Sequence, residues 1–155
     1  MRFEQVDGFQ VGGVAARTSN ARETTPDGVI PKLWIGAMEF REEAPRSLDS
    51  AMSALYTEYE SDEHGPYTFV LGAKADPAWE IPDGLVLKTV PAGRYAVFTS
   101  ARGPVQKVVV ETWQRIWREL PSTKNLRSYV ADFEVHDQRA SDPANAVVDI
   151  YAGVK

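Results

Sequence analysis

The chain has 155 residues, of which 43% are hydrophobic and 25% are charged. It contains no apolar run near the roughly 20 residues that span a bilayer and no apolar core of a signal peptide. We therefore expect a cytoplasmic protein without a membrane segment. Because it lacks cysteine and has only two histidines, we expect no disulfide, no metal centre and no cofactor. The net charge of −5 argues against direct nucleic acid binding, which needs a clustered basic face.

The first half of the chain predicts a β-α-β-β order of elements. Residues 6–18 alternate in polarity and contain Gly12-Gly13, which is typical of a strand with a bulge or a close backbone approach. Two strands at 52–60 and 67–74 flank a turn-rich segment and predict a hairpin. Between the first strand and the hairpin, apolar residues recur at i, i+3, i+4, i+7 and i+8, the spacing of an amphipathic helix that ends before Pro45: Ile30, Leu33, Trp34, Ala37 and Met38.

The second half repeats this order after a connection at residues 75–84. Strand-like segments at 85–90 and 94–101 flank a tight turn in which we expect Gly93 to take a positive φ. A helix follows Gly103-Pro104 and ends at Pro121. Strands at 127–137 and 146–153 complete the chain. We therefore predict one α+β domain, residues 1–155, made of two duplicated β-α-β-β units at about 1–75 and 85–155 with a largely antiparallel sheet.

The strand RSYVADFEVHD, residues 127–137, carries the most informative pattern. Apolar and polar residues alternate along it, as in a half-buried strand. Its polar face is predicted to hold Asp132, Glu134 and His136 together with Val130, while Tyr129 and Phe133 belong to the opposite face. An overlay of the two units places Tyr59-Glu60 on Phe133-Glu134, so Glu60 either forms a second half-site or lies at a solvated hairpin end.

Six segments in this order resemble the GyrI-like effector-binding domain of bacterial transcription regulators, including AraC-type regulators, and most of all the stand-alone integron-associated effector-binding proteins. The segments are IPKLW, YESDEHGPYTFVLG, VPAGRYAVF, WQRIWREL, DFEVHD and DIYAGVK. The resemblance covers nearly the whole chain and implies two main helices and a drug- or metabolite-binding cleft between the duplicated units. Because the effector-type domain uses all 155 residues, we expect no DNA-binding region.

The resemblance also implies a set of site residues. In the family a glutamate on a late strand lies at the base of an aromatic pocket and pairs with cationic, lipophilic ligands, and its position in DFEVHD assigns this role to Glu134. The aromatic walls map onto Trp34, Tyr56 and Tyr151.

Spacing along the predicted elements adds three candidates to this set. Trp113 and Trp117 lie one helical turn apart, a spacing that is also typical of core residues, and we expect one or two of Trp34, Trp113 and Trp117 to touch ligand. His136 shares the face of Glu134 if the strand is regular, and it either tunes the glutamate, bonds to ligand or lies at the surface.

A carboxylate walled by aromatic rings has a physical reason to bind organic cations. Burial disfavours the charged carboxylate, an arriving cation reverses that penalty by direct attraction, and each ring adds about 0.5–2 kcal/mol of cation–π attraction. We therefore predict a stand-alone binding protein for hydrophobic, cationic small molecules, linked to transcription regulation or multidrug sensing.

Two alternatives from other classes stay open. Kinship implies a hydrolase of reactive cyclopropane-bearing toxins, in which Glu134 and a tyrosine act as general acid and base. It also implies a gyrase-inhibitor-like interaction module that uses surface residues such as Glu60 and Asp62, with a regulator or gyrase as its protein partner. The sequence offers neither a cysteine nucleophile nor a G-x-S-x-G elbow, so binding is favoured over catalysis.

Overall fold

A computed structural model of the chain describes residues 1–39 and 47–155. Its described strands form one eight-stranded sheet in the order β1-β6-β8-β7-β3-β4-β2-β5, and every neighbouring pair is antiparallel. The strands are β1 Arg2–Val6, β2 Phe9–Ser19, β3 Ser47–Thr57, β4 Pro66–Ala75, β5 Val86–Val90, β6 Gly93–Thr99, β7 Arg127–His136 and β8 Asp149–Val154. The helices are α1 Asn20–Glu23, α2 Ile30–Glu39, α3 Val105–Glu119 and the short η1 Ser122–Lys124 and η2 Gln138–Ala140.

The sheet is curled, so that its two ends approach each other. The chain passes from edge strand β1 to β2, and from edge strand β5 to β6, through connections of only two residues. Such short connections require strands from opposite ends of the sheet to lie close together. Inside the curl, the ring of Phe133 on the central strand β7 packs against Phe9 of β2 at 5.3 Å and Tyr95 of β6 at 5.2 Å. This face of the sheet therefore closes over its own apolar core.

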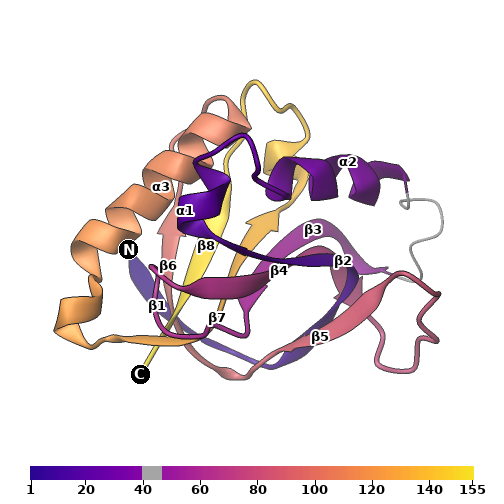
Figure 1. The fold of residues 1–155 in the computed structure, drawn as a ribbon, viewed down its shortest axis with the longest axis horizontal. Coiled ribbons are helices and arrows are strands. Elements are labelled where there is room, and N and C mark those ends of the chain that lie inside the picture. The colour runs from indigo at the N-terminus through magenta and orange to yellow at the C-terminus, as the bar shows by residue number, and fades with distance from the viewer. Residues whose placement is uncertain (40–46) are drawn as a thin grey trace.

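The opposite face of the sheet carries the two main helices, α2 and α3, as Figure 1 shows. Beneath α3 lies a buried cluster that includes Phe98, Ile116 and Ile150, and beside α2 lies a second cluster around Phe69. Tyr56 on β3 packs against both clusters. The central pair of strands, β3 and β7, therefore lies where the territories of the two helices meet.

The predicted fold class is confirmed, and the start of α2 and both ends of α3 lie within a residue or two of their predicted positions. The predicted helix end before Pro45 lies outside the described residues. From the centre of the sheet outward, one half has the order β3-β4-β2-β5 and the other has the equivalent order β7-β8-β6-β1. The duplication itself stays a prediction. No helix in the described part of the chain has the length and apolarity needed to cross a membrane.

Two local expectations are wrong. Gly93 does not take a positive φ, and among the described glycines that conformation occurs at Gly84, in the connection before β5. The turn before Gly93 joins β5 and β6, which pair with different neighbours, so it makes a crossing between sheet ends and not a hairpin. The polar composition of residues 20–28 predicts a loop, but this segment contains α1, whose first turn is capped by the Ser19 hydroxyl.

The glycines of β2 allow a close approach of two backbones without a bulge. The pairing of β2 with β4 is unbroken from Gln10 to Ser19 and sets Gly13 opposite Gly72. An added Cβ at Gly72 would lie 1.9 Å from the carbonyl oxygen of Gly12, and one at Gly13 would lie 2.0 Å from that of Leu71. Any side chain here would collide with backbone, so the close approach depends on glycine.

We predict that Gly72→Ala lowers the free energy of unfolding by at least about 2 kcal/mol, because rigid backbone must move to admit the methyl group. The matched control is Gly36→Ala in α2, where an added Cβ meets nothing within 4 Å and should stabilise the helix by about 0.5–1 kcal/mol. Urea unfolding of the three proteins measures both effects. Equal stability of the two alanine variants would contradict this account of β2.

Candidate functional site

The carboxylate of Glu134 lies on the helix-bearing face of β7, with only 3% of the residue exposed. Its Oε2 accepts hydrogen bonds from the Tyr56 hydroxyl at 2.6 Å and from the Trp113 indole at 2.8 Å. Its Oε1 lies 2.8 Å from Nε2 of His136. The carboxylate therefore has partners on β3, α3 and its own strand, and both oxygens are hydrogen-bonded.

These partners decide the charge of the buried group. Burial raises the pKa of Glu134, but the hydrogen bond and charge of His136, together with the hydrogen bonds of Trp113 and Tyr56, outweigh it and hold this pKa below its ordinary value. Burial and the neighbouring Glu134 raise the pKa of Tyr56 well above its ordinary value, so Tyr56 keeps its proton and remains a donor. An ionised carboxylate can only accept, so the facing Nε2 of His136 carries a proton.

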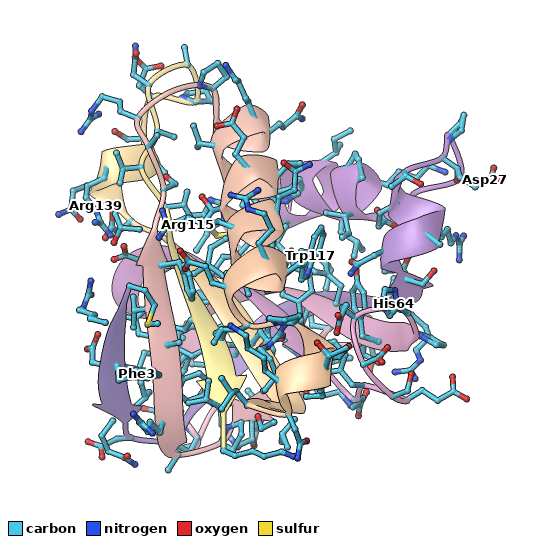
Figure 2. The ribbon with its side chains drawn as sticks, turned by 90° about the vertical axis from the view of Figure 1, so that its left-hand side faces the viewer. Phe3, Asp27, His64, Arg115, Trp117 and Arg139 are labelled. Atoms are coloured by element: carbon cyan, nitrogen blue, oxygen red, sulfur yellow. The ribbon has the colours of Figure 1, made fainter. Side chains whose placement is uncertain are left out.

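Aromatic rings enclose this carboxylate from both helices. The Tyr56 ring lies 5.1 Å from the Trp113 ring, which in turn stacks on Trp117 at 6.2 Å. From α2, the Trp34 ring contacts the imidazole of His136 at 4.9 Å. Trp34 and Trp117 are half-buried and form the outer members of the group, and Figure 2 shows Trp117 on the flank of α3 that faces the α2 side of the molecule. The site combines one negative charge with several π faces.

Six of the seven predicted site residues come together here: Glu134, Tyr56, Trp113 and His136 in direct contact, with Trp34 and Trp117 around them. The seventh, Tyr151, lies on the opposite face of the sheet, stacked on Phe133 inside the curl at 4.5 Å.

Glu60, the candidate for a second half-site, lies beyond the end of β3 and is exposed. This position agrees with the second of the two possibilities that the sequence allowed for Glu60, a solvated hairpin end.

A second buried acid, Asp132, lies two residues before Glu134. Its Oδ1 accepts the amide of Gly153 at 2.8 Å, and its Oδ2 accepts the Tyr59 hydroxyl and Nη2 of Arg127 at 2.5 Å. The side chains of Asp132 and Arg127 are 0% and 1% exposed, so the pair forms an ion pair within the protein interior. The sequence placed Asp132 beside Glu134 on the polar face, but nothing in the pattern pointed to Arg127 or Tyr59 as its partners.

A bulge in β7 explains why part of the predicted strand alternation is wrong. Pairing with β8 slips between Arg127 and Asp132, and Tyr129 takes a φ of 51°. The bulge turns Val130 outward to 57% exposure and brings the Tyr129 ring over the Arg127 guanidinium at 4.6 Å. Tyr129 was predicted to share the face of Phe133, yet its ring lies 5.9 Å from that of Tyr59, near the second acid.

Tyr67 connects the two buried acids through ring contacts. Its ring lies 5.3 Å from Tyr56 and 5.7 Å from Tyr59, whose hydroxyls bind Glu134 and Asp132 respectively. A continuous aromatic row therefore runs along this face of the sheet beneath the helices. In the sequence, the only indication of this row was the presence of several tyrosines on either side of the first hairpin turn.

The fold is that of an effector-binding domain. The family model of the Cass2 integron-associated effector binding proteins matches residues 2–154, so the chain belongs to that family. A curated relative from Bacillus subtilis strain 168, "Putative transcriptional regulator protein YobU", is 38% identical over 146 residues, covering 92% of this chain and 90% of the relative.

Solved structures agree with this assignment. The integron cassette protein VCH_CASS2 from the mobile metagenome of Vibrio cholerae superposes with a TM-score of 0.76 at 28% identity, covering 99% of this chain and 95% of that one. The structure of SAV2435 bound to tetraphenylphosphonium gives a TM-score of 0.78 over 99% of this chain and 93% of that one. At 17% identity this second likeness shows the shared fold.

We predict that Glu134→Gln lowers the free energy of unfolding by about 1–3 kcal/mol at pH 7, because one of the donors then faces an amide NH₂ group. The folded-state pKa of Glu134 lies below the ordinary 4.5, so its stabilisation is complete above that pH and is lost as the pH falls through the folded value. Urea unfolding between pH 7 and pH 3.5 should therefore show the gap between wild type and variant closing in acid. The exposed Glu60→Gln controls for the lost charge, and a gap that widens in acid would contradict the prediction.

We predict that Asp132→Asn destabilises the protein by about 3–5 kcal/mol, since it leaves the guanidinium of Arg127 buried without its ion-pair partner. Asp137→Asn is the matched control. It removes the carboxylate of a half-exposed ion pair with Arg139 at 2.9 Å and should cost about 1 kcal/mol or less. Chemical unfolding at neutral pH compares the two, and similar losses would show that burial of the first pair does not matter.

Proposed function

We propose that this chain binds lipophilic organic cations at Glu134, between α2 and α3. The observation that carries the proposal is a buried carboxylate with a lowered pKa, hydrogen-bonded and enclosed by aromatic side chains from both helices. A buried negative charge that is bonded to one histidine and to neutral donors attracts positive charge strongly, because little water screens it.

The donors around Glu134 position its charge without using a lysine or arginine. Tyr56 and Trp113 are neutral donors, so the carboxylate keeps its negative charge while its oxygens are held in place. The rings of Trp34 and Trp117, which are half-buried, then offer apolar area and cation–π attraction to the organic part of a ligand. Preorganised charge with flat apolar walls selects for positive charge and hydrophobic area and requires little hydrogen-bond geometry.

The relatives support the same class of ligand. SAV2435 shares the fold and was solved with tetraphenylphosphonium, a lipophilic cation. The name of the Bacillus subtilis relative describes a transcriptional regulator, and we propose that binding of such cations by this chain serves as a signal for transcription regulation or multidrug sensing.

Titration of intrinsic tryptophan fluorescence with tetraphenylphosphonium tests the proposal, because Trp113 donates directly to the binding carboxylate. We expect saturable quenching in wild type and about 5- to 150-fold weaker binding in Glu134→Gln, the equivalent of losing about 1–3 kcal/mol from a buried charged partner. Tetraphenylborate, an anion of the same shape, should bind far more weakly than the cation.

The exposed Glu60→Gln variant controls for the overall change in charge and should bind like wild type. Equal affinity for the two tetraphenyl ions, or an unaffected Glu134→Gln variant, would contradict the proposal. Time-dependent release of a product from a reactive lipophilic compound, lost in Glu134→Gln, would instead assign the site to a hydrolase.

A further inference from the structure

A shallow hollow of about 320 Å³ lies on the protein surface, formed by β2, α1, the turn between β3 and β4, and the start of β4. Its volume falls at the lower end of the range of small-molecule sites. The residues that line it are Arg17, Thr18, Ser19, Arg22, His64 and Pro66. Figure 2 shows His64 beneath α1, with Asp27 beyond it. No carboxylate residue is among those that line the hollow.

Both guanidinium groups of the hollow are held in place by uncharged acceptors. Arg22 donates from Nε to the backbone carbonyl of Asp27 at 3.0 Å. Arg17 donates from Nη1 to the backbone carbonyl of Glu58 and to the Thr68 hydroxyl at 3.2 Å. Among the described residues, neither guanidinium forms an ion pair within 4.0 Å. Each guanidinium group is thus bonded to neutral acceptors, and no described carboxylate pairs with its charge.

The carboxylates nearest in sequence to the hollow have other partners. Glu23 accepts the backbone amides of Val29 and Ile30, which begin α2, and the Thr18 hydroxyl. Glu58 pairs with Lys88 at 3.0 Å, and although the charge of Arg17 contributes to its lowered pKa, hydrogen bonds from Thr68 and Lys88 contribute more.

In the turn between β3 and β4, Asp62 accepts the backbone amide of His64 at 2.9 Å, and Glu63 accepts the Tyr129 hydroxyl and lies 3.7 Å from His64. The side chain of His64 is 80% exposed, and this residue lines the hollow. These carboxylates thus have partners of their own, and the hollow presents two guanidinium groups, an imidazole and a serine hydroxyl.

We infer that this hollow binds a small oxyanion, the phosphoryl or polycarboxylate group of a second ligand. Guanidinium groups match such oxygens in geometry and form their strongest hydrogen bonds with them. Arg22 offers its terminal nitrogens, since its described hydrogen bond uses only Nε. The site is confined to one hollow on a chain of net charge −5. Nucleic acid binding requires a more extended positively charged surface, so we expect a small ligand here.

Titration of the isotope-labelled protein with sodium pyrophosphate, followed by amide chemical shifts at constant ionic strength, tests this inference. We expect saturable shifts at Ser19, Arg22 and His64, and at least about tenfold weaker binding in Arg22→Ala. Arg118→Ala, which removes one exposed positive charge from the last turn of α3, is the matched control and should bind like wild type. Glu134→Gln should also leave pyrophosphate affinity unchanged, so this test does not depend on the cation site.

A parallel titration with citrate distinguishes the two chemical sources. Tighter binding of pyrophosphate identifies a phosphoryl ligand, and tighter binding of citrate identifies a polycarboxylate, and either result supports an oxyanion site. Shifts that chloride reproduces at the same ionic strength, or an Arg22→Ala variant that binds as well as wild type, would overturn the inference. The amide spectrum of Arg22→Ala itself reports whether that variant is folded.

Discussion

The carboxylate of Glu134, buried among donors from β3, α3 and β7, is the interaction on which the rest of the account depends. An isolated ionised carboxylate would be too costly to bury, so the three donors must stay in register for the fold to keep its charge. Because Tyr56 and Trp113 come from different halves of the chain, the same contacts that stabilise the charge also align one half of the molecule with the other.

The central strand pair makes this alignment possible. β3 and β7 pair without a slip from Met52 to Thr57, which fixes Tyr56 opposite Asp132 and close to Glu134. On the other side of β7 the bulge before Asp132 releases Tyr129 and Arg127 from the regular pattern and builds the second buried acid. One strand thus carries an acid bonded to tyrosine, tryptophan and histidine and an acid that is paired with arginine. The cation site that we propose uses the first of these acids.

Much of this arrangement follows from the sequence, because it rests on periodicity. The apolar spacing around Trp34 and Trp113 predicts both helices, and the alternation in β7 predicts that Glu134 and His136 share a face. The remaining features depend on distant parts of the chain, which no local pattern encodes. The bulge at Tyr129, the burial of Arg127 and the position of Tyr151 inside the curl all follow from how β7 pairs with β8 and how the sheet closes.

The most direct test of the central claim is the ionisation of Glu134 itself, followed by the carbon-13 chemical shift of its side-chain carboxyl group during a pH titration, with and without saturating tetraphenylphosphonium. The account predicts a midpoint below 4.5 in the free protein, as the hydrogen bonds of the site require, and a still lower midpoint with the cation bound. A carboxyl group that stays protonated near neutral pH, or a midpoint that the cation does not lower, would contradict the claim that Glu134 is the charge that binds the ligand.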